Sequence, residues 1–173
     1  MSERHFKLLA NYNRVTNELM NTIIKEITEE EWNREFNGFF KSIHELCSHI
    51  YIGDFNWLKR FKNLRAFNAL NKSIFEKEYK FTETIFENIA ESVVMRKELD
   101  DIIIEYINEL EKDDLEKILQ FKDSKGSNIE RKMEPLILHM FNHQTHHRGM
   151  ISLYLELLGK ENSFSDSLYR MEL

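Results

Sequence analysis

Cysteine, proline, glycine and long apolar runs are scarce in this sequence, and each shortage removes a class of structure. Cys47 is the only cysteine, so no disulfide can form within the chain. One proline and five glycines in 173 residues favour helices over a turn-rich β-sandwich. No apolar run approaches the roughly 18 residues that span a membrane, and charges stand where a signal peptide would need an apolar segment. We therefore expect a cytoplasmic protein that does not contact a membrane.

Positive charge is also in short supply. Lys and Arg total 24 against 30 Asp and Glu, which gives a formal net charge of −6. A surface that neutralises phosphates needs the opposite balance, so nucleic acid is not an expected partner. Apolar residues make up 42% of the chain, and its length suits one globular domain. We therefore expect a single domain over residues 1–173.

The apolar residues recur with the period of a helix in four segments, residues 4–27, 42–61, 84–110 and 135–158. Capping boxes, in which Ser or Thr is followed three residues later by Glu, are expected to begin the second helix at Ser42 and the third at Thr84. Pro135 is favoured in the first turn of the last helix, and Gly159 would end it. The first helix is predicted to bury the stripe of Leu8, Tyr12, Val15, Leu19 and Ile23.

Between the third and fourth helices, residues 115–133 alternate apolar and polar side chains on both sides of the turn-forming stretch DSKGSN. This alternation predicts a small β-hairpin. Four amphipathic helices in one domain predict a helical bundle. The expected fold is therefore all-α, a four-helix bundle with a small β-hairpin between the third and fourth helices.

Histidines are concentrated in the last helix, where the stretch HMFNHQTHHRGM holds four of the chain's seven. On a helical wheel His143 and His147 straddle the centre of the apolar face, and His139 and His146 lie at its shoulder. Residues four apart are about 5–6 Å apart at Cβ, so both central rings can reach one ion. Protonated imidazoles are costly to bury, whereas neutral ones can share a divalent ion. The alternative is a set of core histidines that hydrogen-bond to their neighbours.

A third ligand would have to come from another helix, because one helix does not easily supply three convergent side chains. His49 lies at the shoulder of the apolar stripe of residues 42–61 and is the preferred residue. His44 lies well off that stripe and is expected in solvent. His5 has a suitable phase but lies near the chain terminus.

Two other metal motifs and a reactive cysteine fit the sequence poorly. His44 and His49 in HELCSH are five residues apart and point in different directions, whereas the metalloprotease helix needs a spacing of four. A di-iron carboxylate bundle needs Glu three residues before His, and no histidine here has one. Cys47 is interpreted as a small hydrophobe rather than a nucleophile or ligand, as is usual for a buried cysteine on a helix.

The stretches SIHELCSHIYIGDFNWL and HMFNHQTHHRGM, with the hairpin FKDSKGSNIERKM before the latter, resemble the DinB superfamily over nearly the whole chain. Members of that superfamily include bacillithiol transferase-like and mycothiol-dependent enzymes. The resemblance implies a metal bound by His49, His143 and His147, and a homodimer. Met150 stands where the family usually has Gln, which puts in doubt any ligand or substrate role of that Gln.

Three neutral histidines would leave one coordination position open, as in catalytic metal sites. A divalent ion there, foremost Zn or Ni with Fe or Cu as alternatives, would ionise a bound low-molecular-weight thiol or acidify a bound water. The resemblance favours the first chemistry and implies a metal-dependent thiol transferase-like enzyme acting on a small-molecule thiol and an electrophile. The alternatives are a metal-assisted hydrolase and a non-catalytic metal-binding or dimeric interaction protein.

Two arginines carry further expectations. Ser92 and Arg96 form a polar interruption in the apolar stripe of the third helix. They would either contact an anionic group of a substrate or, as we expect, leave Arg96 with its stem packed and its guanidinium in water. Arg148 is expected to pair with an acidic residue and to take no part in chemistry.

Overall fold

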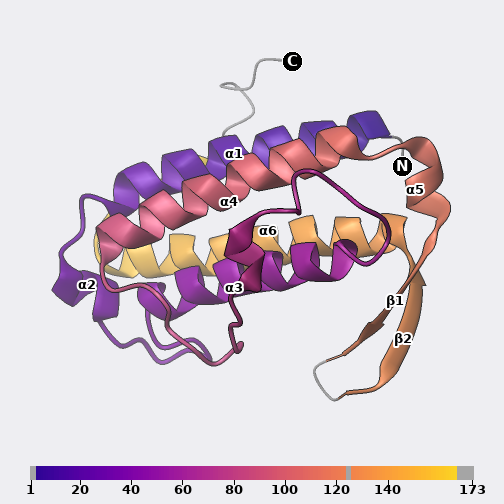
Figure 1. Cartoon of the computed structure of the whole chain (residues 1–173). Helices are drawn as coiled ribbons and strands as arrows, with labels where there is room; N and C mark the ends of the chain where they lie inside the picture. Colours follow the sequence, from indigo (N-terminus) through magenta and orange to yellow (C-terminus); the bar gives the residue numbers. More distant parts are fainter. Residues whose placement is uncertain (1–2, 124–125, 167–173) are drawn as a thin grey trace.

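The computed structural model describes residues 3–123 and 126–166 and has the expected architecture of long helices and a small hairpin (Figure 1). The long helices are α1 (Glu3–Ile24), α3 (Ile43–Phe61), α4 (Ile89–Glu109) and α6 (Met133–Leu157). The shorter elements are α2 (Glu29–Asn33), the 3-10 helix η1 (Ser73–Glu76), α5 (Lys112–Glu116), β1 (Ile118–Lys122) and β2 (Asn128–Lys132). None of the helices in these ranges is long and apolar enough to cross a membrane.

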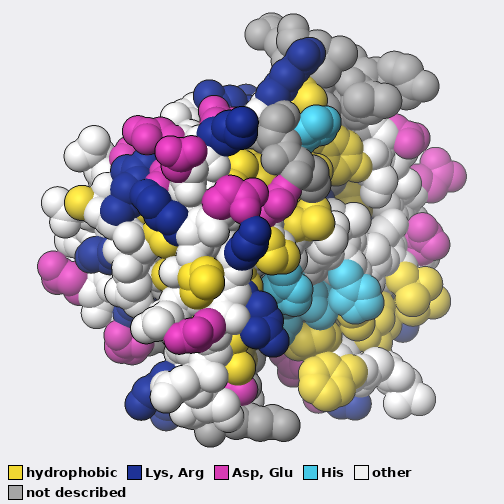
Figure 2. All heavy atoms as spheres, turned by 90° about the vertical axis from the view of Figure 1, so that its right-hand side faces the viewer, with side chains coloured by type: hydrophobic (Ala, Val, Ile, Leu, Met, Phe, Trp, Pro, Cys, Tyr) yellow, Lys and Arg dark blue, Asp and Glu magenta, His cyan; other side chains and the backbone are white. Residues whose placement is uncertain are grey.

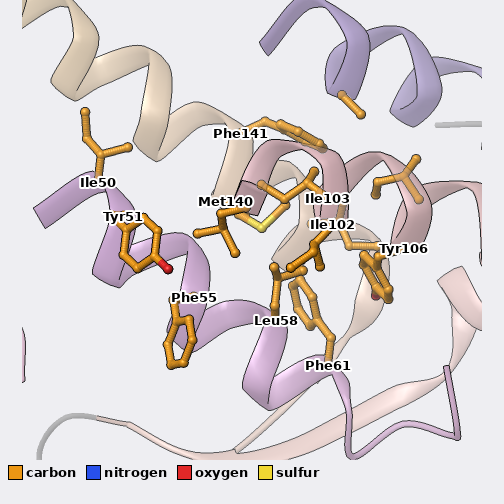
Figure 3. Close-up of a cluster of buried hydrophobic side chains, with 14 of the residues drawn as sticks. Ile50, Tyr51, Phe55, Leu58, Phe61, Ile102, Ile103, Tyr106, Met140 and Phe141 are labelled. Carbon is orange, nitrogen blue, oxygen red and sulfur yellow. The ribbon is translucent and has the colours of Figure 1, made fainter. Parts of the chain in front are cut away.

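The bundle consists of two helix pairs, α1 packed along α4 and α3 packed along α6. Figure 1 shows the first pair lying over the second. Buried side chains of α3, α4 and α6 meet between the pairs (Figure 3). They include Ile50, Tyr51, Phe55, Leu58, Phe61, Ile102, Ile103, Tyr106, Met140 and Phe141. Close packing of these large side chains fixes the spacing of α3 and α6, the two helices that carry the candidate site.

The buried face of α1 differs from the predicted one. Asn13, Thr16 and Asn17 are buried in the bundle. The predicted stripe is half-buried or exposed along its whole length, at Leu8, Tyr12, Val15, Leu19 and Ile23. The same face also buries Phe6, Ala10, Met20 and Ile24. The prediction was wrong because it chose the stripe that is apolar throughout, whereas the middle of the bundle interior accepts amide side chains that hydrogen-bond to the other helices.

Helix starts agree with the sequence in one case and differ in another. Ser42 caps α3 as predicted, and its Oγ accepts a hydrogen bond from the Glu45 amide at 3.1 Å. The predicted start at Thr84 is wrong, because α4 begins after Asn88, whose Oδ1 accepts from the Glu91 amide at 2.9 Å. Asn88 followed by Glu91 is as good a helix-capping signal as Thr84 followed by Glu87. The sequence therefore offered two possible starts for this helix.

Two short helices lie in connectors that were not predicted to be helical. In α2, Thr28 and Glu31 form a complete capping box, with each side chain bonded to the other residue's amide. In α5, Glu111 and Asp114 form the corresponding pair. Both signals were present in the sequence, but the helices contain no full amphipathic period that could be recognised.

The predicted hairpin is confirmed. Strands β1 and β2 pair antiparallel with Phe121 opposite Ile129, and the hairpin extends away from the bundle (Figure 1). The chain passes directly from β2 into α6, where the Met133 amide donates to the Lys117 carbonyl at 3.0 Å. The hairpin thus holds the start of the helix that supplies two histidines of the candidate site.

Candidate metal centre

Three of the predicted ligands converge on one point between α3 and α6. His49 comes from α3, and His143 and His147 come from successive turns of α6. One ring nitrogen of each lies within 4.8 Å of the others, and Nε2 of His49 lies 3.0 Å from Nε2 of His143. Figure 2 shows histidine side chains gathered at the surface with hydrophobic side chains beside them. The three residues chosen from the wheel and the resemblance are therefore neighbours in space.

Gly53 creates room for the ring of His143. This glycine is buried on α3, one turn after His49. A Cβ at residue 53 would stand 2.8 Å from Cε1 of His143 and 3.2 Å from its Nδ1. A real Cβ does not approach so closely, so any other residue here would push the ring away from its present place. Gly53 stands on the apolar stripe of residues 42–61, where nothing in the sequence pattern indicated this function.

All three imidazoles are held in the neutral form. Burial lowers the pKa of His49. Burial and the surrounding histidines of α3 and α6 lower the pKa of His143 to about 3. Burial, His49 and His146 together lower the pKa of His147 to about 4. The rings therefore present nitrogen lone pairs at neutral pH, the form in which histidine binds a metal.

The donor set fits a divalent ion. Two nitrogens held at about 2.0–2.1 Å by one tetrahedral ion lie roughly 3.3 Å apart, close to the separation of His49 Nε2 and His143 Nε2. Without an ion, those two nitrogens can be satisfied only by sharing a single proton. Buried Nδ1 atoms of His143 and His147 also have no hydrogen-bond partner within the described part of the chain. Three neutral imidazoles in this arrangement suit Zn, Ni, Cu or Fe.

Aromatic side chains surround the cluster on one side. Phe40 packs against the rings of His49 and His147, at centroid distances of 4.5 and 5.3 Å. Its position is fixed by Tyr154, whose hydroxyl donates to the Phe40 carbonyl at 2.6 Å. A cleft of about 500 Å³ opens beside His49 and is lined by Phe39, Phe40, Glu45, Phe81, Thr82, Glu83 and Thr84. A small molecule can therefore approach His49 from solvent.

The remaining histidines lie outside the cluster. His139 and His146 are exposed at the shoulder of the apolar face and contact Trp57 and His147 respectively. His44 is not in solvent as expected. Its ring stacks on Trp32, and its Nδ1 lies 3.0 Å from Oδ1 of Asn33 in α2. The prediction failed because α2, which covers His44, was not foreseen.

Cys47 agrees with its interpretation as a small hydrophobe. The residue packs against the hydrophobic core. Burial raises the pKa of its thiol to about 12, which keeps it protonated. A protonated, buried thiol is a poor nucleophile and a poor ligand.

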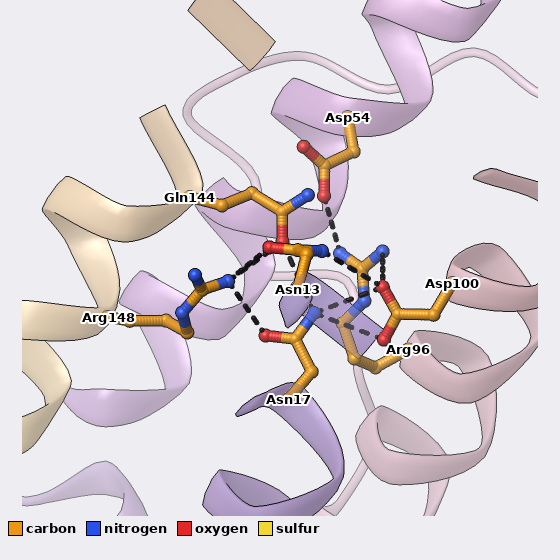
Figure 4. A network of polar contacts seen from close by, with 7 residues as sticks. All are labelled: Asn13, Asn17, Asp54, Arg96, Asp100, Gln144 and Arg148. Atoms are coloured by element: carbon orange, nitrogen blue, oxygen red, sulfur yellow. Dashed lines mark hydrogen bonds and ion pairs between the residues drawn. The ribbon is translucent and has the colours of Figure 1, made fainter. Parts of the chain in front are cut away.

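A second polar cluster, which we call the buried network, lies in the bundle interior and was not predicted (Figure 4). It consists of side chains from all four long helices, Asn13, Asn17, Asp54, Arg96, Asp100, Gln144 and Arg148. Arg96 donates to Oδ2 of Asp54 at 2.7 Å and to Oδ1 of Asp100 at 2.9 Å. Both expectations for Arg96 were wrong, because its guanidinium reaches neither solvent nor the histidine cluster.

Arg148 also differs from its expectation. Its hydrogen bonds go to amide oxygens of Asn13, Asn17 and Gln144, and to the Thr145 hydroxyl, rather than to a carboxylate. Burial lowers its pKa to about 10, although Asp100 opposes this effect. Two buried cations face two buried carboxylates in the network, but Oδ1 of Asp54, Nε of Arg96 and Nε2 of Gln144 have no hydrogen-bond partner in the described residues. The i, i+4 pair of Arg96 and Asp100 was visible in the sequence, whereas the partners from the other three helices were not.

Comparison with known proteins agrees with the fold and with the recognised motifs. The DinB family model matches residues 1–173. Protein DinB of Bacillus subtilis strain 168 is 28% identical over 172 residues, covering 96% of this chain and 92% of that protein. A crystal structure of a DinB-like protein from Bacillus cereus has a similar fold, with a TM-score of 0.58 and 16% identity over 84% of this chain and 87% of that one. The chain belongs to the DinB family.

Proposed function

We propose that His49, His143 and His147 bind one divalent metal ion, foremost Zn or Ni with Fe or Cu as alternatives. The observation that carries this proposal is the convergence of three neutral imidazoles from two helices, of which two keep an Nδ1 atom without a hydrogen-bond partner in the described residues. Within the described ranges no fourth Cys, Asp, Glu or His joins the group. Three protein ligands leave a coordination position for a small molecule, the arrangement typical of catalytic rather than structural sites.

We further propose that the protein is a transferase that conjugates a low-molecular-weight thiol to an electrophile. A bound divalent ion would supply the positive charge that makes a coordinated thiol ionise near neutral pH. The cleft beside His49 gives such a thiol access, and the aromatic rings of Phe40 and Phe81 exclude water from one side of it. The sulfur then forms the bond to carbon, the leaving group departs with its electron pair, and the thiol proton passes to solvent.

The test combines metal analysis with a thiol-conjugation assay. Purified protein should contain about one ion per chain. His147→Ala should lose the ion and the activity together. His146→Ala is the matched control, because it removes an exposed imidazole from the adjacent position and should retain both. Conjugation that continues at an unchanged rate after chelation would contradict the proposal, and turnover that needs the metal but no thiol would assign hydrolysis instead.

We also propose that the chain forms a homodimer, as the family resemblance implies. Leu153 and Leu157 lie one turn apart on α6 and are 52% and 57% exposed. Two neighbouring exposed leucines on one helix face suit the centre of a surface that a second copy of the chain covers. Light scattering on the eluting protein should give twice the mass of 20.9 kDa. Leu153→Glu should shift the mass to that of a monomer, and a wild-type monomer would contradict this proposal.

A further inference from the structure

The cleft beside His49 brings aromatic rings and carboxylates together. Besides two threonines, its other lining residues are Phe39, Phe40, Phe81, Glu45 and Glu83. The rings are open to a ligand, since Phe39 is 86% exposed and Phe81 is 39% exposed. No Lys or Arg of the described chain lines this cleft. A ligand that enters it therefore meets ring surface and negative charge, and no cationic side chain.

Both glutamates of the cleft keep their negative charge uncompensated. Oε2 of Glu45 accepts a hydrogen bond from the Lys41 amide at 2.6 Å, and Oε2 of Glu83 accepts one from the Lys80 amide at 3.0 Å. A backbone amide carries no net charge, so these bonds hold the carboxylates in place without neutralising them. Within residues 3–123 and 126–166 neither glutamate forms an ion pair with a Lys or Arg. Each can therefore attract a cation from solvent.

The rings provide a second kind of contact for a cation. Phe39 meets Phe40 edge-on at a centroid distance of 5.0 Å, and Phe81 lies 5.9 Å from the ring of His49. The face of an aromatic ring carries partial negative charge and attracts a positive group, while its carbon surface favours apolar atoms. Among the described residues no Lys or Arg occupies the face of any of these three phenylalanines. An ammonium group with alkyl substituents uses both properties of such a wall.

A bound metal ion would oppose a cationic ligand, so the sum of the charges decides. The histidines are neutral, and a divalent ion therefore adds two positive charges. A bound thiolate cancels one of them, and the carboxylates of Glu45 and Glu83 outweigh the other. An anionic ligand would face the two carboxylates at close range. The cleft as a whole therefore favours a cation.

We propose that the cleft beside His49 binds an organic cation with an apolar surface, and that this cation is the electrophile to which the thiol is transferred. The inference rests on the proposed function and specifies its second substrate. The phenylalanines and Glu45 and Glu83 hold the ammonium group, and the reactive carbon faces the histidine cluster. The thiolate sulfur forms the new bond to that carbon, and the leaving group departs with the electron pair of the bond that breaks.

The first experiment measures binding alone, through amide chemical shifts of the full-length protein loaded with Zn²⁺. The probes are choline and 3,3-dimethyl-1-butanol, which have the same shape and differ only in a positive nitrogen in place of a neutral carbon. Choline should bind about five-fold more tightly, the combined scale of one cation–π contact and one partly exposed charge pair. It should also shift the amides of Phe81 and Thr82. Equal affinities for the two probes would overturn the inference.

Variants then identify the residues responsible. Glu83→Gln should lower the preference for choline to about three-fold, and adding Glu45→Gln should leave about two-fold, the part supplied by the rings. Glutamine keeps an oxygen that accepts the same backbone amide, and melting temperatures check that each variant is folded. Glu87→Gln is the matched control, because Glu87 is equally exposed, lies four residues after Glu83 and does not line the cleft. A preference that stays five-fold without both glutamates would contradict the inference.

The second experiment separates this inference from the proposed function. The metal-loaded protein receives 2-mercaptoethanol with either (2-bromoethyl)trimethylammonium or its neutral counterpart 1-bromo-3,3-dimethylbutane, and bromide release is compared with the uncatalysed reaction of each. The rate enhancement should be about five-fold larger for the cation. Equal enhancements would overturn this inference and leave the transferase intact. If choline is preferred but neither bromide is conjugated, the proposed transferase fails, and the assignment of the cation as its electrophile fails with it.

Discussion

Two clusters of polar side chains lie inside the bundle, and they differ in the charges that they bring together. In the buried network, Arg96 and Arg148 face Asp54, Asp100 and amide oxygens, although Oδ1 of Asp54, Nε of Arg96 and Nε2 of Gln144 have no hydrogen-bond partner in the described residues. In the histidine cluster, His49, His143 and His147 are of one kind, all neutral, and the group contains no opposite charge. Opposite charges account for the first cluster without a ligand. Three neutral imidazoles directed at one point are what a metal cation requires, which is why we assign a ligand to the second.

Removing Arg96 should produce the largest effect, because the network depends on its charge. Arg96→Met would leave Asp54 and Asp100 buried without their cation, and breaking a buried pair in this way costs about 3–5 kcal/mol of unfolding free energy. Urea denaturation measures the loss. Lys97→Gln is the control, since it breaks the exposed pair with Asp101 and should cost less than about 1 kcal/mol. Equal stability of the two variants would show that the network does not hold the helices together.

The histidine cluster should respond to metal, whereas the network should not. Zn²⁺ at about 100 times its dissociation constant should stabilise the wild type by about 2.7 kcal/mol through linkage. His49→Ala should lose this gain. Arg96→Met, if folded, should keep it, because its own contacts lie outside the cluster. Thermal unfolding with and without Zn²⁺ measures the difference, and a gain that survives in His49→Ala would contradict the assigned ligands.

The position of the His143 ring can be disturbed by a substitution that replaces none of the three proposed metal ligands. Gly53→Ala places a Cβ against the imidazole, so metal affinity should fall roughly ten-fold, the scale seen when the support of a ligand is altered. Competition with a chromophoric chelator measures the affinity. Gly149→Ala is the matched control, because a Cβ at that helical glycine meets no atom within 4 Å. Equal affinities for the two alanine variants would mean that Gly53 does not position the ring.

Acid should weaken the metal-free protein through the same histidines, and we expect this to be the smallest effect because the rings are partly open to solvent. Their pKa values in the folded state, about 3 for His143 and about 4 for His147, lie below the ordinary value of 6.5. Between about pH 3 and pH 6.5 the unfolded chain therefore binds more protons than the folded chain. Stability is fully present above pH 6.5 and declines as the pH falls towards about 3, the folded-state pKa of His143. Urea midpoints across this range should fall less steeply for His143→Gln, and an equal slope would contradict the assignment.

The sequence predicted the fold and the histidine cluster because both depend on regular spacing. Helical period located the four long helices, and the separation of His143 and His147 by four residues placed them on one face. His49 could be preferred from its place on the α3 stripe, and the family resemblance pointed to the same residue. These features are local to one helix each, or are carried by a motif.

The rest of the structure depends on contacts between distant segments. Asn13 and Asn17 are buried because Asp100, Gln144 and Arg148 meet them from other helices. Read alone, α1 presents Leu8 and Val15 as the better core residues, so the wrong face was selected. Arg96 was likewise expected in solvent, because its partner Asp54 lies on α3; its second partner, Asp100, is four residues later on α4 and could have been noticed in the sequence.

The metal itself is the most direct test of the account. Crystals grown with Zn²⁺ and measured at the zinc absorption edge should show one strong anomalous peak, within about 2.0–2.1 Å of a ring nitrogen from each of His49, His143 and His147. A map without a peak between α3 and α6, or with the three rings pointing apart, would contradict the central claim.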